Sequence, residues 1–238
     1  MRRSPLLCRP EEKAELEARN TLNQLEFLTD LVHRGATEVR ESHVRELQRI
    51  AVQDVYPCGG QYRDARFQLK ISDSTLRPPE PAMLRGLMAE FLDNCNDRSA
   101  PANVRMAYAL WRFNWIHPFP GGNGRTARAL SYLIFCMDMK QMPPGDITIP
   151  ALIASDRNGY IAALRAVDER YESTGDSEVR LVHRVDVLAP MVRYLDEKIE
   201  AQLLSGLEQG IAQLPPGWRP FASFALALLK SYLRNRQP

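Results

Sequence analysis

The sequence predicts an all-α fold, a helical bundle with one small β-hairpin flap over a glycine-rich loop. Apolar residues recur at three- and four-residue steps along most of the 238 residues, which is the period of an amphipathic helix. The segment 126–139 is apolar on nearly all sides, which is typical of a helix buried at the centre of a bundle. Strand-like alternation is confined to a short stretch around residue 69.

Each element is bounded by residues that start or stop regular structure. Helical periodicity covers 10–33, where Gly35 ends it, and resumes up to about residue 55. The stretch 57–77 contains two glycines and then alternation, and two prolines follow it, so we expect the hairpin there. Further helices are expected at 79–94, 104–116, 126–139, 149–171 (a pair), 178–204 and 221–233.

These elements suggest one lobe in three parts. Residues 1–56 form N-terminal helices that pack on the core, residues 57–175 form the core with the flap and the glycine-rich loop, and residues 176–238 form C-terminal helices of the same lobe.

Composition excludes several functional classes. Lys and Arg number 31 against 29 Asp and Glu, so the net charge of +2 gives no strong basic field, and we expect no nucleic-acid partner. No apolar run approaches the roughly 18 residues that a membrane helix needs, and the N-terminus lacks a secretory signal, so we expect a cytoplasmic protein with no membrane partner. The four cysteines show no C-x-x-C pair and no zinc spacing, which favours reduced, structural thiols.

The loop HPFPGGNGRTAR, residues 117–128, carries the chemistry. Pro118 stops the preceding helix and fixes His117 at its end. Glycines at 121, 122 and 124 let backbone N–H groups approach a ligand at the start of the next helix, which is a ready anion site. Arg125 and Arg128 lie on one face of its first turn, where two guanidinium groups suit adjacent phosphates. His117 supplies a group suited to proton transfer near neutral pH.

A glycine-rich turn alone, or a histidine at a helix end alone, is usually structural. Their combination with two arginines in helical register favours a polyphosphate site with a general base at its edge.

The loop resembles the Fic motif H-x-F-x-[D/E]-G-N-G-R-x-x-R. The sequence GQYR at 60–63, with the prolines at 78–79, is similar to the flap region of that family, and DRNGY at 156–160 is similar to the segment that borders the nucleotide base. The resemblance covers roughly residues 55–175 and implies a helical enzyme that transfers part of a nucleotide, usually AMP from ATP, to a protein hydroxyl.

The resemblance also implies roles for individual residues. His117 would take the proton from the attacking Ser, Thr or Tyr hydroxyl, and Phe119 would anchor the loop in the core. Gly122, Asn123 and Gly124 would hold the phosphates, with the Asn123 amide on the α-phosphate.

Further from the loop's centre, Arg125 and Arg128 would hold the β- and γ-phosphates. Tyr160 would border the adenine, and Asp168 stands where the family more often has Asn. The target protein would dock on the flap, at about 66–77, by adding a strand.

One position departs from the family pattern. Gly121 replaces the acidic residue that ligates the divalent metal, so Mg²⁺ would be held weakly, by phosphates and water, and no protein metal ligand is expected. Gly124 keeps the usual glycine, whereas a lysine there marks relatives that phosphorylate, so nucleotidyl transfer is favoured.

Many relatives carry an inhibitory helix with the pattern [S/T]-x-x-x-E-[G/N], within the chain or on a separate partner. TEVRES at 37–42 fits this pattern up to Glu41, and EARNTL at 17–22 places Glu17 in a similar setting with shifted spacing. Both segments also fit a solvated helix face with i,i+4 pairs.

Two other functions stay open. A nucleotide-binding pseudoenzyme or interaction module would result if Gly121 had abolished metal-dependent transfer. A related transferase or phosphodiesterase that uses another phosphate donor would still employ His117 and the two arginines.

Overall fold

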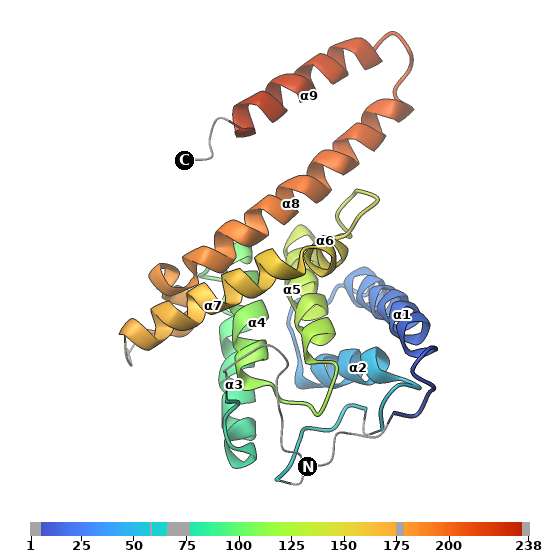
Figure 1. Ribbon diagram of the computed structural model, residues 1–238. Coiled ribbons are helices and arrows are strands. Elements are labelled where there is room, and N and C mark those ends of the chain that lie inside the picture. The colour runs from blue at the N-terminus through green and yellow to red at the C-terminus, as the bar shows by residue number, and fades with distance from the viewer. Residues whose placement is uncertain (1–5, 58, 66–76, 175–178, 235–238) are drawn as a thin grey trace.

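The computed structural model describes residues 6–57, 59–65, 77–174 and 179–234, and these are all helix, turn or irregular structure without a strand (Figure 1). In chain order the elements are α1 (Lys13–His33), α2 (Glu41–Val52), a 3₁₀ turn (Pro81–Met83), α3 (Leu84–Cys95), α4 (Ala102–Ile116), α5 (Asn123–Met139), α6 (Ile149–Ser155), α7 (Arg157–Thr174), a second 3₁₀ turn (Leu181–His183), α8 (Val185–Gln213) and α9 (Arg219–Arg234). The prediction of an all-α fold is confirmed.

Helix α5 lies at the centre and packs against α1, α2, α4 and α6. Its interior residues are almost all buried, as are Trp111 and Phe113 of α4. The apolar sequence of α5 therefore reflects a helix that other helices surround on most sides.

Helix α1 is fixed over α2 by two buried amides. Asn20 Nδ2 donates to the carbonyl of Gln53 at 2.8 Å, and Gln24 Nε2 donates to the carbonyl of Leu47 at 2.8 Å. These contacts set the position of α1 beside the N-terminal end of α5, because α1 and α2 both pack on that helix.

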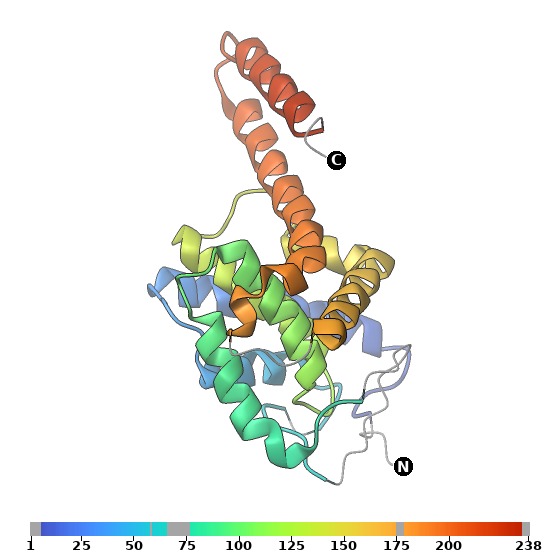
Figure 2. The ribbon, with the colours of Figure 1, turned by 90° about the vertical axis from the view of Figure 1, so that its left-hand side faces the viewer.

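Helix α8 begins and ends later than its sequence pattern indicates, at residues 185 and 213 instead of 178 and 204. Gly206 continues the helix because the absence of a side chain lets Pro144 approach; a Cβ there would lie 2.7 Å from the proline ring. Helix α8 packs on α4 and α7 and stays in contact with the body up to Gly206, whereas its last turns and α9 extend away from the body of the molecule (Figures 1 and 2).

The predicted β-hairpin flap is not supported in the part of the chain that the structure describes. Residues 59–65 and 77–80 are irregular or turn, and residues 66–76, which hold the alternation, lie outside the described residues. Among the cysteines, Cys8, Cys95 and Cys136 are free, and Cys58 lies outside the described residues. None of the helices described combines the length and the apolar character that crossing a membrane requires.

Candidate functional site

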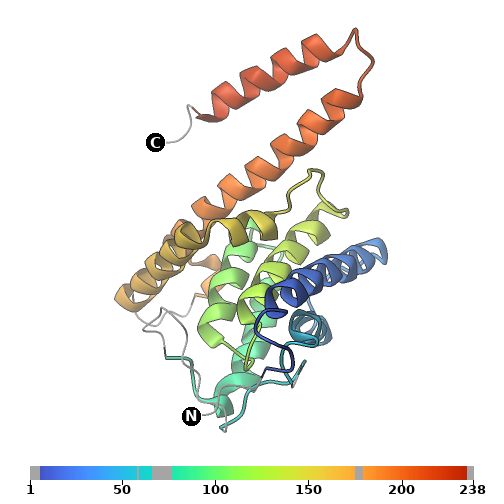
Figure 3. The ribbon, with the colours of Figure 1, turned by 45° about the vertical axis from the view of Figure 1, so that its right-hand side comes forward.

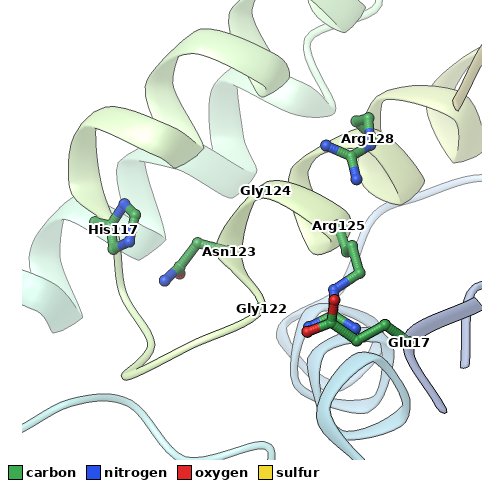
Figure 4. A pocket seen from close by; sticks show the side chains of 7 residues that line it. All are labelled: Glu17, His117, Gly122, Asn123, Gly124, Arg125 and Arg128. Atoms are coloured by element: carbon green, nitrogen blue, oxygen red, sulfur yellow. The ribbon is translucent and has the colours of Figure 1, made fainter. Parts of the chain in front are cut away.

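A cavity of about 350 Å³ opens at the N-terminal end of α5. Its lining residues are Glu17, His117, Gly122, Asn123, Gly124, Arg125 and Arg128 (Figure 4). Six of these seven come from the loop 117–128, so the structure brings together the histidine, the glycine-rich turn and both arginines of the sequence motif.

His117 caps the C-terminus of α4 in a left-handed conformation, with φ 50° and ψ 57°. Its backbone N–H donates to the carbonyl of Phe113 at 2.9 Å, and its Nδ1 lies 3.2 Å from the carbonyl oxygen of Asn114. A carbonyl can only accept, so Nδ1 carries the hydrogen and Nε2 holds the lone pair. Burial lowers the pKa of His117 to about 4, with a smaller contribution from the charge of Arg63. The neutral imidazole is therefore ready to accept a proton at Nε2.

Arg63 holds the end of α4 in place. Its Nε donates to the carbonyl of His117 at 2.8 Å, and its Nη2 donates to the carbonyls of Ile116 at 3.2 Å and Pro79 at 2.5 Å. Its backbone N–H donates to the carbonyl of Pro118 at 2.8 Å. The side chain is 6% exposed, and it satisfies carbonyls that the helix end leaves without partners. The sequence suggested only that GQYR belongs to a flap region; its role behind His117 depends on this tertiary contact.

Gly122 directly precedes α5 as its N-cap and has a left-handed backbone conformation with φ 76°. A Cβ at this position would lie 2.7 Å from Cγ1 of Val52 in α2, so both the conformation and the packing require glycine. The carbonyl of Gly122 accepts hydrogen bonds from the N–H and the hydroxyl of Thr126, both at 3.0 Å.

Two buried amides shape the rest of the loop. Asn123 Oδ1 accepts from the N–H of Phe119 at 3.0 Å, and Asn123 Nδ2 donates to the carbonyl of Phe119 at 2.8 Å. Gln48 of α2 donates through Nε2 to the carbonyl of Gly121 at 3.0 Å. The Asn123 side chain thus fixes the loop, and its amide nitrogen has one further hydrogen for a ligand. Sequence reasoning missed Gln48, because nothing local in α2 indicates this contact.

The first turn of α5 presents backbone N–H groups to the cavity. The intrahelical bonds begin at the N–H of Thr126, so the N–H groups of residues 123–125 have no helical acceptor. A Cβ at Gly124 would meet just one neighbour, Arg128 Nη1, at 3.6 Å, so glycine is not required there by packing. Its absence of a side chain leaves room between the helix end and the guanidinium of Arg128.

Arg125 points into the cavity and meets a carboxylate from a distant part of the chain. Its Nη2 lies 3.1 Å from Oε1 of Glu17 in α1, whereas its Nη1 is buried with no hydrogen-bond partner (Figure 4). Burial lowers the pKa values of Arg125 and Arg128, which reflects the cost of keeping two cations away from water. Two partly desolvated cations beside free N–H groups form a strong attractive field for an anion.

The two sequence candidates for a regulatory glutamate have different positions. Glu17 lines the cavity, although 108 residues separate it from Arg125 along the chain. Glu41 instead pairs with Arg45 at 2.8 Å on the exposed side of α2 and is not among the lining residues.

The two predicted base-contact residues lie outside the cavity lining. Tyr160 is 7% exposed, and its hydroxyl accepts from Asn114 Nδ2 at 2.9 Å. Asp168 accepts from Trp111 Nε1 at 2.7 Å, and burial raises its pKa. Asp168 therefore has a structural partner in this fold, and Tyr160 lies behind the residue that orients His117.

The residues present do not fit a protein-held divalent metal. The cavity lining contains one carboxylate, that of Glu17, and this carboxylate already forms an ion pair with Arg125. No cluster of three or more His, Cys, Asp or Glu side chains with metal-binding geometry occurs within the described ranges. Gly121 has no side chain and therefore supplies no oxygen ligand beyond its backbone carbonyl, which accepts from Gln48.

Comparisons with known proteins indicate a family for the range that contains the loop. Residues 38–135 match the Fic/DOC family, and this range includes α2 through most of α5 with the loop. A Fic domain-containing signalling protein from Bacteroides thetaiotaomicron shares the fold with a TM-score of 0.62 at 24% identity over 81% of this chain and 72% of that one. Fic-1 from C. elegans, residues 134–508, has a TM-score of 0.52 at 24% identity over 78% of this chain and 51% of that one.

A Fic family protein from Desulfovibrio desulfuricans has a TM-score of 0.52 at 18% identity over 76% of this chain and 53% of that one. A search of curated proteins finds no match. The chain spans about half the length of the last two structures. Residues 38–135 therefore match the Fic/DOC family, and the helical fold of the chain is similar to that of a solved Fic domain-containing protein.

Proposed function

We propose that the protein transfers AMP from ATP to a Ser, Thr or Tyr hydroxyl of a target protein. Fic proteins are generally transferases of this type, and residues 38–135 match that family. The observation that carries the proposal is the buried, unpartnered Nη1 of Arg125, which faces a cavity shared with free backbone N–H groups and His117. A buried guanidinium nitrogen without an acceptor is costly, and a phosphate oxygen satisfies it.

In the proposed reaction, His117 accepts a proton on one side of the cavity, and the start of α5 stabilises negative charge on the other side. The target's hydroxyl oxygen bonds to the α-phosphorus, the bond from that phosphorus to the bridging oxygen breaks, and diphosphate leaves with the electron pair. Nε2 of His117 accepts the hydroxyl proton. The N–H groups of residues 123–125, Arg125 and Arg128 stabilise the charge that develops on the leaving diphosphate.

Glu17 restrains this reaction in our proposal. Its carboxylate occupies Nη2 of Arg125, so the terminal phosphates of ATP must displace it to gain both guanidinium nitrogens. Replacing Glu17 by Gln removes the charge and keeps the shape, and we expect tighter ATP binding and faster transfer. Glu15→Gln is the matched control, because Glu15 is exposed on the same helix and does not line the cavity. Equal activity of the wild type, Glu17→Gln and Glu15→Gln would contradict the restraint.

The test of the function itself uses labelled ATP with a protein lysate. Transfer of label from α-labelled but not γ-labelled ATP to protein supports nucleotidyl transfer, whereas label from γ-labelled ATP alone indicates phosphorylation. His117→Ala should lower the labelling rate by about 10²–10⁴ while ATP affinity, measured by calorimetry, changes only a few-fold. Undiminished labelling by this variant would refute the assignment of His117.

Two observations favour a second candidate, a nucleotide-binding module without transfer. Gly121 offers no metal ligand, and Glu17 already occupies the cavity. ATP binding without label transfer from either position, in the wild type and in Glu17→Gln, would support this candidate. Removal of label from a premodified target would instead indicate a phosphodiesterase.

A further inference from the structure

One buried side chain of α2, that of Gln48, lies between the two segments that flank the start of α5. Helix α2 packs on α5 beside the glycine-rich loop (Figure 3). Gln48 is 1% exposed, and both ends of its amide have backbone partners. Its Nε2 donates to the carbonyl of Gly121 at 3.0 Å, and its Oε1 accepts from the N–H of Gly60 at 2.5 Å. A terminal amide suits both contacts, because it combines N–H donors with a carbonyl acceptor.

The contact with Gly121 sets the direction of the N–H that follows it. A peptide unit is planar and trans, so its C=O and the next N–H point in opposite directions. Gln48 holds the carbonyl of Gly121 towards α2, and the N–H of Gly122 therefore points away from α2. A Cβ at Gly122 would meet Val52, Ala51 and Nε2 of Gln48, which places α2 directly behind this residue, and Gly122 lines the cavity. Within the described ranges this N–H has no hydrogen-bond acceptor.

The backbone at the start of α5 directs this N–H towards the anion site. Gly122 is left-handed, with φ 76° and ψ 1°, and Asn123 opens the right-handed helix. A left-handed residue next to a right-handed one turns successive N–H groups towards one point, the concave anion-binding arrangement known as a nest. The N–H of Gly122 thus joins those of residues 123–125, in the cavity that Arg125 also lines.

The peptide unit between Gly121 and Gly122 depends on an outside contact for its direction. Both residues are glycines, whose backbones rotate with little steric restriction. A reversed peptide unit would place its carbonyl oxygen in the cavity in place of the N–H, and that oxygen would repel a phosphate. The hydrogen bond from Gln48 opposes the reversal, because reversal would leave a buried amide donor without a partner.

The other end of the Gln48 amide fixes the segment behind His117. Gly60, with φ 75°, gives its N–H to Gln48, and its carbonyl accepts from Nη1 of Arg45 at 2.9 Å. Three residues later in the chain, Arg63 bonds to the carbonyl of His117. One side chain of α2 therefore aligns the loop that holds the phosphate site with the segment that supports the histidine.

We propose that Gln48 is a positioning residue for the phosphate site, which keeps the N–H of Gly122 turned into the cavity and the loop in register with the segment behind His117. This role rests on the proposed function, because the ligand that this N–H meets is a phosphate of ATP. The loss of one hydrogen bond to a charged phosphate weakens binding about tenfold to a hundredfold.

Gln48→Met tests this role, because methionine keeps the length of the side chain and removes both hydrogen bonds. Gln202→Met is the matched control. Gln202 of α8 is also 1% exposed, accepts from the N–H of Ile149 at 2.8 Å and donates to the carbonyl of Pro143 at 3.2 Å, but its partners do not adjoin residues that line the cavity. We expect both variants to have a lower Tm, and only Gln48→Met to bind ATP at least about tenfold more weakly by calorimetry. Unchanged ATP affinity in a folded Gln48→Met would overturn the proposal.

Gln48→Glu adds a readout that a purely structural role would not move. An ionised carboxylate can only accept, so it keeps the contact with Gly60 and repels the carbonyl of Gly121, whereas a protonated carboxyl group can donate to that carbonyl. Burial raises the pKa of a carboxyl group, which brings its titration into the range from about pH 8 to 5. We expect the ATP affinity of this variant, as a ratio to that of the wild type at each pH, to rise about tenfold as the pH falls over this range.

Gln202→Glu controls for the buried charge, and it should show a similar pH dependence of Tm with a level affinity ratio. The charged or titratable groups beside the contact, Arg45, Arg49 and Tyr56, are common to the wild type and the variant, so the ratio cancels their effect. A level ratio for folded Gln48→Glu would overturn the proposal, as would a wild type that does not bind ATP. ATP affinity that depends on Gln48 without any transfer of label would instead refute the transferase and retain the role of Gln48.

Discussion

The tautomer of His117 follows from one contact, and its pKa follows mainly from burial. The carbonyl of Asn114 keeps the hydrogen on Nδ1, while burial holds the pKa at about 4 instead of the usual 6.5. The folded state favours the neutral imidazole more strongly than the unfolded state does. This preference adds to the free energy of unfolding above pH 6.5, and the added stability is lost as the pH falls from 6.5 towards 4. The same shift keeps the imidazole neutral throughout the neutral range, which is the form that the proposed role as a base requires.

This shift gives a prediction for the pH dependence of the reaction. We expect kcat/KM for transfer to stay level from about pH 8 down through 6.5 and to fall only as the pH approaches about 4, because kcat/KM reports the free enzyme. Rates measured across this range with a fixed target protein check it. A descending limb centred at 6.5 would show that His117 is more solvated than this structure has it.

Arg63 should act on the rate and not on ATP binding. In Arg63→Lys a single ammonium group replaces the guanidinium that bonds to the carbonyls of Ile116, His117 and Pro79, so the end of α4 loses part of its support. We expect kcat to fall about tenfold to a hundredfold with KM for ATP little changed. Arg85→Lys, at an exposed position on α3, serves as the control. A rise in KM at constant kcat would instead place Arg63 in nucleotide binding.

The sequence identifies the site residues that lie close together along the chain. It misses contacts that form only when distant helices pack together. His117, Arg125 and Arg128 lie within twelve residues, and helix geometry alone brings the two arginines together. The approach of Glu17 to Arg125 requires α1 to pack on α2 and α5, which no local pattern encodes. The base-contact roles that the resemblance implies for Tyr160 and Asp168 stay predictions, and the hydrogen bonds of these two side chains to Asn114 and Trp111 are tertiary contacts that the sequence did not indicate.

The start of α5 depends on a backbone shape that only glycine adopts easily. Gly122→Ala places a Cβ 2.7 Å from Val52 and forces a residue with a side chain into φ 76°. We expect a loss of about 1–3 kcal/mol in the free energy of unfolding, seen as a lower Tm, together with weaker ATP binding. Gly210→Ala, inside α8 with no atom near the added Cβ, should stabilise the protein by up to about 1 kcal/mol. Equal effects of the two changes would contradict the special role of Gly122.

The preceding residue can accept a side chain, which makes a metal test feasible. A Cβ at Gly121 would lie 3.6 Å from the ring of Tyr56, an ordinary contact, and φ at Gly121 is outside the left-handed region. Gly121→Asp should therefore fold, bind Mg²⁺ with ATP more tightly and transfer faster, because it supplies the missing oxygen ligand. Gly121→Asn controls for shape without the charge. Melting curves and Mg²⁺ titrations check the result, and an Asp variant that folds without any gain would show that the wild type works without this carboxylate.

The boundaries of elements are predicted best where a residue forces them. Pro118 ends α4, as expected, whereas α5 begins three residues before the predicted start because the loop glycine at 122 serves as its cap. Helix α8 continues through two glycines to residue 213. Gly206 does not mark a helix end, because glycine is present there to allow the close approach of Pro144. Such packing reasons are not encoded in periodicity.

Across the whole molecule, the sequence predicts the helical class and the central position of α5 from apolar content alone. It does not predict that the C-terminal end of α8 and α9 extend from the body, because a periodic apolar pattern does not specify which surface covers it. The cavity at the start of α5 thus lies in the body of the molecule, whereas α9 lies outside the body (Figure 1).

The contacts of Arg63 have a consequence for how this protein can change over evolution. Its guanidinium bonds both to the end of α4 and to the carbonyl of Pro79, so the chain leaves at residue 63 and returns at residue 79 to one fixed anchor. Two stretches of chain that are sixteen residues apart therefore share one side chain, and a lineage that loses this arginine would lose the support of the helix end and of the returning chain in a single step.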